Sequence, residues 1–193
     1  MKYFKKLIGK KCYLSPINVE DAETYCEWLN NWEIGVNLLT FSQQLSLERE
    51  KKILQDMIDN NNQIFAIVDI SNDKLIGNCS IFRINLPNRK AEVGIFIGDK
   101  SYWNKNYGKE ALSLLVDYGF NVLNLNNIML EVFSFNERAI KCYKKVGFKE
   151  IGRRREAFIR AGKKYDEIYM DLLAQDFESI FIKKSQFNLI NYV

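Results

Sequence analysis

The chain has 193 residues, of which 47% are hydrophobic and 27% charged, which suits one globular domain and excludes disordered, collagen-like and low-complexity proteins. It contains no histidine, which excludes Ser-His-Asp and Cys-His nucleophilic sites and histidine-ligated zinc. The formal net charge of +4 is unevenly distributed, because residues 20–59 hold nine acidic and three basic side chains, whereas residues 141–164 hold two acidic and ten basic ones.

The first third of the chain predicts one strand and two helices. Residues 11–17 (KCYLSPI) form the predicted strand. Asn18 is a suitable N-cap for a helix that begins with two acidic residues, and Ser46 begins a second predicted helix that ends at residue 59. The apolar segment between the helices, residues 32–44, is expected to be a long loop with a functional role.

The middle of the chain is dominated by predicted strands. Residues 64–70 and 75–84 predict a hairpin, and residues 91–97 predict a further strand. A loop then leads into a helix over residues 109–124, whose apolar side chains cover the wide face expected of a helix packed on a sheet.

The last part of the chain predicts a strand, a helix and a hairpin. Residues 128–134 form the strand, Asn136 is the N-cap of the helix, and Gly147 occupies the position of a left-handed C-cap. Residues 149–159 and 163–173 predict the final hairpin. This order indicates an α/β fold of the mixed α+β type, with one central, mostly antiparallel sheet and helices on both faces.

The cysteines and the apolar segments indicate the compartment. The cysteines, Cys12, Cys26, Cys79 and Cys142, form no CxxC pair, so neither a cysteine zinc cluster nor a redox dithiol is expected. No run reaches the roughly 18 consecutive apolar residues of a membrane helix, and the charged first residues lack the apolar stretch of a secretory signal. We therefore expect a cytoplasmic protein with packed thiols, no metal and no membrane partner.

Two segments hold residues suited to ligand binding or catalysis. Residues 103–111 (WNKNYGKEA) join a strand to a helix, so that backbone N–H groups and the helix dipole converge beside Lys105 and Lys109. Positions 106 and 108 hold Asn and Gly, which tolerate a left-handed backbone, so the loop predicts a pyrophosphate site or a plain strand–helix connection. In the second segment, Glu131 and Tyr143 are a carboxylate and a phenol on successive elements, suited to general base and acid.

Residues 91–148 resemble the acetyl-CoA-binding core of the GNAT superfamily of N-acetyltransferases. The segments EVGIFI, WNKNYGKEA and LEVFSFNERAIKCYKKVGF follow one another like the family's splayed strand, pyrophosphate loop, next strand and acid-bearing helix. The segments EDAETYCEWLNNWEI and RRREAFIRAGKKYDEIYMDLL resemble the branch that contains ribosomal-protein alanine N-acetyltransferases and spermidine N-acetyltransferases. The resemblance implies a GNAT domain over residues 1–174 and an extension over residues 175–193.

The resemblance also implies roles for individual residues. Tyr143 matches the general acid that protonates the departing CoA thiolate. The general base is Glu131, which we favour, or Glu92 acting through water. The amine attacks the thioester directly, without an acyl-enzyme or a metal. The residues expected to bind acetyl-CoA are Ile95, Phe96, Ile97, Trp103, Asn104, Lys105, Asn106, Tyr107, Gly108, Lys109, Asn136, Ala139 and Tyr143, of which Trp103 and Asn106 depart from the family's Q/R-x-x-G-x-G/A loop.

The acceptor is predicted from the first two helices, which form the acceptor wall in this family. The acidic residues 20–59 and the aromatic residues Trp28, Trp32 and Phe41 favour a cationic amine: a polyamine, an aminoglycoside or a basic protein N-terminus. The alternative is that the aromatic rings belong to the core and the acids are merely solvated.

Two other classes compete with the enzyme. One is a non-catalytic acyl-CoA-binding regulatory domain, against which Tyr143 and Glu131 argue. The other is a nucleic-acid binder, which the absence of a recognition motif disfavours. The expected partners are acetyl-CoA and an amine, and a homodimer is left open.

Overall fold

The computed structural model describes residues 2–60, 63–179 and 181. Its elements in chain order are β1 (Leu7–Ile8), β2 (Cys12–Pro16), η1 (Val19–Asp21), α1 (Ala22–Leu29), α2 (Trp32–Gly35), η2 (Leu39–Ser42), α3 (Leu47–Asp59), β3 (Gln63–Asp69), β4 (Leu75–Asn85), β5 (Lys90–Ile97), η3 (Lys100–Tyr102), α4 (Tyr107–Asn121), β6 (Asn127–Phe133), α5 (Glu137–Val146), β7 (Lys149–Arg160), β8 (Lys163–Leu173) and η4 (Ala174–Asp176). Within these residues, no helix has the length and apolar character needed to cross a membrane.

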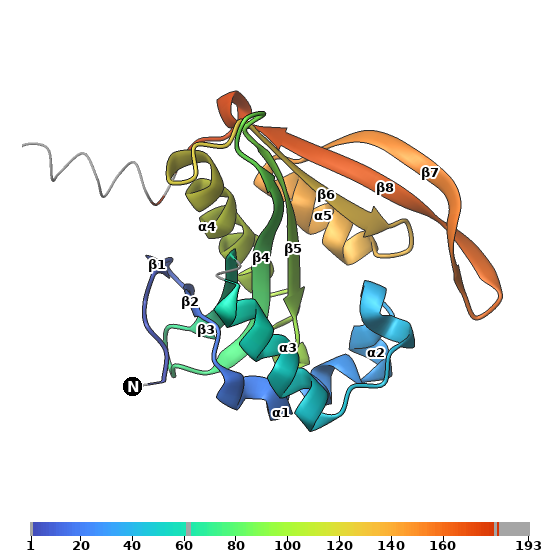
Figure 1. The fold of residues 1–193 in the computed structure, drawn as a ribbon. Coiled ribbons are helices and arrows are strands. Elements are labelled where there is room, and N and C mark those ends of the chain that lie inside the picture. The colour runs from blue at the N-terminus through green and yellow to red at the C-terminus, as the bar shows by residue number, and fades with distance from the viewer. Residues whose placement is uncertain (1, 61–62, 180, 182–193) are drawn as a thin grey trace, which may run out of the picture.

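The strands form one sheet in the order β1-β2-β3-β4-β5-β6-β8-β7, and all neighbours are antiparallel except β5 and β6 (Figure 1). The parallel pair is short, because β5 and β6 are in register only from Lys90 opposite Asn127 to Glu92 opposite Met129. Beyond Glu92 the two strands separate, and no described strand pairs with this edge of β5. The sheet is therefore split at its centre.

Side chains on the two faces of the sheet enter two separate cores. In β2 and β3, Leu14 and Ile67 pack in the core that contains α4 and α5. Their chain neighbours Tyr13 and Ala66 pack in the core that contains α1 and α3. This alternation with a period of two residues is the pattern of strands that are covered on both faces. The predicted arrangement, one mostly antiparallel sheet between helices, is confirmed.

Three predicted N-caps and one predicted C-cap agree with the structure. Side chains of the three predicted N-caps accept backbone hydrogen bonds, Asn18 from Glu20, Ser46 from Arg49 and Asn136 from Ala139. Gly147 ends α5 with a φ of 119°, in the left-handed region that favours glycine.

Two boundaries were predicted wrongly. The segment 32–44, expected to be a loop, contains α2 and η2, because the side chain of Asn31 accepts a hydrogen bond from the Glu33 N–H at 3.0 Å and starts a helical turn. The helix expected over residues 109–124 is α4, which begins directly after the left-handed Asn106 and ends before the left-handed Asn124.

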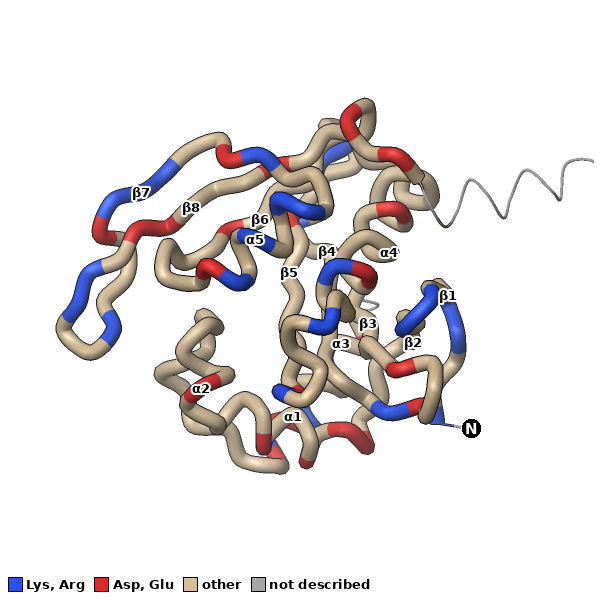
Figure 2. The backbone as a smooth tube through the Cα atoms, turned by 180° about the vertical axis from the view of Figure 1, so that it is seen from behind, with Lys and Arg blue, Asp and Glu red and all other residues tan. Residues whose placement is uncertain are grey.

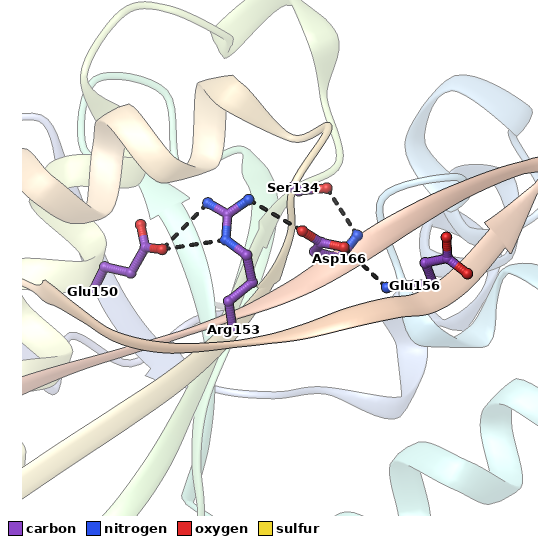
Figure 3. Close-up of polar contacts among 5 residues, drawn as sticks. All are labelled: Ser134, Glu150, Arg153, Glu156 and Asp166. Carbon is purple, nitrogen blue, oxygen red and sulfur yellow. Dashed lines mark hydrogen bonds and ion pairs between the residues drawn. The ribbon is translucent and has the colours of Figure 1, made fainter.

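The β7–β8 hairpin is long, extends past the end of β6 and approaches α2 (Figure 1). Ion pairs and hydrogen bonds hold the hairpin where the register between β7 and β8 shifts (Figure 3). Arg153 bridges Glu150 at 3.2 Å and Asp166 at 3.3 Å, and the Asp166 carboxylate accepts from the Glu156 N–H at 2.9 Å. The Asp166 N–H donates to the hydroxyl of Ser134, just after β6, at 3.1 Å. These bonds tie the hairpin to the strand that borders the split.

Candidate active site

The split between β5 and β6 opens into a cavity of about 970 Å³. Its lining includes β5, the residues around the first turns of α4 and α5, the end of β6 and the segment after α2. Residues of the core with α4 and α5, such as Tyr143, and of the opposite core, such as Phe96, both line it. The cavity therefore passes through the sheet and gives two ligands access to each other from opposite faces.

The loop before α4 has an unusual backbone. Asn104 and Asn106 are both left-handed, with φ values of 60° and 67°. The prediction of a left-handed residue is confirmed at Asn106 but wrong at Gly108, which lies in the first turn of α4 and is helical. A Cβ atom at Gly108 would lie 3.6 Å from Cγ1 of Ile97 and 4.0 Å from Sγ of Cys142. Both distances are ordinary van der Waals contacts, so the structure leaves room for a Cβ atom at this position in the cavity lining.

Trp103 and Arg138 form a rigid pair in the same wall. The Trp103 indole N–H donates to the Ile97 carbonyl at 2.8 Å, which fixes the ring against the end of β5. The Arg138 guanidinium carbon lies 3.5 Å from the centroid of that ring, a cation–π contact. No carboxylate of a described residue pairs with Arg138, and burial lowers the pKa of its guanidinium. The pair presents an arginine suited to binding an anion.

Arg138 lines the cavity but was not among the predicted residues, whereas the predicted Lys105 lies outside the lining. Lys105 does not belong to the cavity lining, whereas Lys109 and, from α5, Lys141 and Lys145 do. The available signal for Arg138 was a basic residue two positions after the N-cap Asn136, on the helix that follows the predicted anion loop. Asn136 and Ala139 line the cavity as well.

Three glutamates on neighbouring strands line the cavity: Glu92 on β5, Glu131 on β6 and Glu167 on β8. Arg83 on β4 lies 2.8 Å from the Glu92 carboxylate and 3.9 Å from that of Glu131. Burial raises the pKa of Glu131, and the negative charges of Glu167 and Glu92 raise it further. The cavity thus holds a carboxylate whose pKa lies closer to neutrality than that of an ordinary glutamate.

Tyr143 on α5 reaches the same cavity from the other face of the sheet. Its side chain is 9% exposed, and its phenol forms no hydrogen bond with any described residue. Burial raises the pKa of this phenol well above its ordinary value, so that it keeps its proton at physiological pH. The structure therefore brings Tyr143, Glu131 and Glu92 to one cavity, as their predicted roles require.

The three aromatic residues expected at the acceptor wall lie elsewhere. Trp28 packs edge-to-face on Tyr25 and Phe96, with ring centroids 5.7 and 6.1 Å apart. Trp32 is 70% exposed and stacks edge-to-face on Phe41. None of the three belongs to the described lining of the cavity, whose aromatic side chains on this face include Phe133 and Phe158.

The acidic residues of segment 20–59, which were expected at the acceptor wall, lie mostly outside the cavity lining. Acidic positions lie along α1 and basic positions lie along α5, whereas the β7–β8 hairpin carries both kinds (Figure 2). Of the nine acidic residues in segment 20–59, Glu50 is the one that lines the cavity. It is 4% exposed, and burial raises its pKa. The carboxylates nearest to the split come instead from the strands.

Comparison with known proteins agrees with this geometry. Residues 11–149 match the family described as "Acetyltransferase (GNAT) domain". The chain is 33% identical over 158 residues to the spermidine N(1)-acetyltransferase of Escherichia coli (strain K12), covering 81% of this chain and 83% of that protein. It is 27% identical over 174 residues to the uncharacterized N-acetyltransferase p20 of Bacillus licheniformis, covering 89% and 97%.

A solved structure shows the same fold. The spermidine N-acetyltransferase from Vibrio cholerae in complex with CoA and spermine matches with a TM-score of 0.77 at 26% identity, covering 87% of this chain and 98% of that one. The split sheet and the phenol and carboxylates that meet at it, together with these matches, show that the chain belongs to the GNAT family of acetyl-CoA-dependent N-acetyltransferases.

Proposed function

We propose that this enzyme acetylates a primary amine of a cationic small molecule, with a polyamine as the first candidate acceptor. The observation that supports this most is the meeting of a buried phenol, Tyr143, with the carboxylates Glu92, Glu131 and Glu167 in one cavity through the sheet. Carboxylates and the rings of Phe133 and Phe158 favour an ammonium group. The 33% identity to a spermidine acetyltransferase supports the same acceptor class over an aminoglycoside or a protein N-terminus.

The residues on the α4 and α5 side fit a CoA thioester as the acetyl donor. The edge of β5 beyond Glu92 has backbone groups that no described strand uses, which suits the amides of a pantetheine arm. The left-handed loop directs the first N–H groups of α4 to the cavity, and Lys109 and Arg138 add positive charge for a pyrophosphate. Asn136 accepts from the Ala139 N–H through its side-chain oxygen, which leaves its amide N–H groups for the donor.

The side chains account for each proton in the transfer. Glu131 takes a proton from the acceptor ammonium, and the freed amine attacks the thioester carbonyl carbon. The new C–N bond forms as the C–S bond breaks, and Tyr143 gives its proton to the leaving thiolate. The second proton that the nitrogen loses as the amide forms returns to the phenolate of Tyr143, so the products are the amide, the CoA thiol and a protonated Glu131. A covalent acyl-enzyme is not needed, in keeping with Cys142, whose thiol pKa is raised by burial.

Glu131 is a better base than Glu92 for an electrostatic reason. The carboxylate of Glu92 is engaged by Arg83 at 2.8 Å, whereas Glu131 lies 3.9 Å from the same guanidinium. The pKa of Glu131 is raised, and a base is most effective when its pKa approaches the working pH.

The same proposal places the enzyme in the cytoplasm, as its four free cysteines favour, and includes a homodimer as its assembly.

A thiol-release assay with acetyl-CoA against a panel of amines tests the proposal. The panel holds spermidine, aminoglycosides, dipeptides with Ala or Ser N-termini and free amino acids. We expect release with spermidine to exceed that with free amino acids, and the Tyr143→Phe variant to lose most of it. Release with the dipeptides alone would replace the polyamine by a protein N-terminus. Silence across the panel, together with acetyl-CoA binding in calorimetry, would favour the acyl-CoA-binding regulatory domain.

A further inference from the structure

Glu167 is a buried carboxylate in the cavity wall to which the transfer described above gives no task. Its residue is 6% exposed. In the register of β6 and β8, Glu131 lies opposite Tyr169 and Phe133 lies opposite Glu167. Because side chains alternate along a strand, all four project from the same face of the sheet, and Glu167 is the diagonal neighbour of Glu131.

Two neighbours hold the carboxylate of Glu167 in place. The phenol of Tyr169 donates a hydrogen bond to Oε2 of Glu167 at 2.5 Å, and Nη1 of Arg154 lies 4.0 Å from the same oxygen. This hydrogen bond raises the pKa of Tyr169, so the phenol keeps the proton that it donates. The hydrogen bond from Tyr169 fixes the orientation of the Glu167 carboxylate within the cavity wall.

Glu131 stands in a different environment from Glu167. Burial and the negative charge of the neighbouring Glu167 raise the pKa of the Glu131 carboxyl group. Glu92 adds negative charge from β5, and the nearest positive charge, Arg83 on β4, lies closer to Glu92 than to Glu131. Among the described residues, Tyr169 and Arg154 contact Glu167, so its carboxylate is held in place beside Glu131.

We propose that Glu167 is a positioning residue that acts through Glu131. Held in place by Tyr169 and Arg154, its carboxylate receives a hydrogen bond from Glu131 once Glu131 has taken the proton of the acceptor ammonium. The N–H bond of the ammonium breaks, the O–H bond at Glu131 forms, and Glu167 stabilises and orients that new O–H group. The inference rests on the proposed function, in which Glu131 is the base.

The direct test follows the carboxyl groups of the free protein by NMR, with glutamate labelled with ¹³C at the carboxyl carbon. The Glu131→Gln variant assigns the resonance of Glu131. We expect its midpoint above the ordinary range, and a fall of about half to one pH unit in Glu167→Gln, as for interacting carboxyl pairs. Tyr169→Phe removes a donor but keeps the charge of Glu167, so the midpoint of Glu131 should not fall there. An unchanged midpoint in Glu167→Gln overturns the inference.

The matched control is Glu150→Gln, which removes an exposed carboxylate on β7 whose partner is Arg153 rather than a cavity residue. It should leave the midpoint of Glu131 unchanged. Thermal unfolding verifies that each variant is folded, and Glu167→Ala carries the test if Glu167→Gln does not fold.

Kinetics separate this inference from the proposed function. With an active amine, the acid limb of log kcat/KM against pH should move to lower pH in Glu167→Gln, because Glu131 stays ionised there. The KM for acetyl-CoA should not change. If Glu131→Gln abolishes the acid limb while Glu167→Gln leaves it at the same pH, Glu131 is the base and the role proposed for Glu167 is wrong. If no amine is acetylated, the proposed function fails, and the NMR midpoint still decides the inference.

Discussion

The phenol of Tyr143 is a single hydroxyl group with a specific task, so its removal gives the simplest test of the site. Tyr143→Phe keeps the ring volume but removes the proton for the leaving thiolate, and should lower kcat at least about ten-fold. Acetyl-CoA affinity, measured by calorimetry, should change little. Tyr118→Phe is the control, because Tyr118 is similarly buried but donates to Gln63 away from the cavity. Equal kcat in Tyr143→Phe and the wild type would remove Tyr143 from the reaction.

The two candidate bases should respond differently to loss of charge. Glu131→Gln should lower kcat/KM by about 100-fold and remove the acid limb of its pH profile. Glu92→Gln frees Arg83, which lies 3.9 Å from Glu131, to pair with that carboxylate. The pKa of Glu131 should then fall and the limb should move to lower pH, with turnover retained. Loss of the limb in Glu92→Gln instead would assign the base to Glu92.

At the scale of the elements, the affinity of the loop before α4 for acetyl-CoA should depend on its backbone conformation more than on its side chains. Asn106 is left-handed, so Asn106→Gly should keep acetyl-CoA affinity, whereas Asn106→Val adds strain of about 1–2 kcal/mol and should weaken binding. Asn124→Val is the control, because Asn124 is left-handed too but does not line the cavity. It should lower stability without changing affinity in calorimetry. Equal affinities in Asn106→Val and Asn106→Gly would contradict the assignment.

The elements themselves could be predicted largely from local pattern. Caps such as Ser46 and the alternation of apolar residues along strands are signals carried by neighbouring residues. The missed features depend on contacts across the chain. Glu167 reaches Glu131 only through the register of β8 on β6, and Arg138 reaches Trp103 only when α5 packs beside the loop. Trp28 has the composition of a ligand-binding residue, but tertiary packing directs it to Tyr25 and Phe96.

At the scale of the whole molecule, the start of the C-terminal extension is bound to α4. The carboxylate of Asp117, fully buried in α4, accepts hydrogen bonds from the Ser179 hydroxyl at 2.8 Å and the Phe181 N–H at 3.0 Å. The ring of Phe177 packs on Phe120, with centroids 5.6 Å apart. The expected boundary at residue 174 therefore lies within one continuous set of contacts. Of residues 180–193, the structure describes residue 181 alone.

These contacts predict that the extension stabilises the domain without serving the reaction. Deletion of residues 175–193 should lower the free energy of unfolding by about 2–4 kcal/mol, measured by urea denaturation, because charged hydrogen bonds and buried apolar area are lost. No described residue of the extension lines the cavity, so kcat should be retained.

Asp117→Leu completes a double-mutant cycle with that deletion. In the full chain the substitution removes the acceptor of the hydrogen bonds from Ser179 and Phe181, and should destabilise the protein. In the deleted chain the carboxylate has lost those two donors but keeps that of Asn121, so the same substitution should destabilise the protein less. A coupling of about 1–3 kcal/mol is expected between the two changes. Additive effects would mean that the stability of the extension comes from contacts other than those with Asp117.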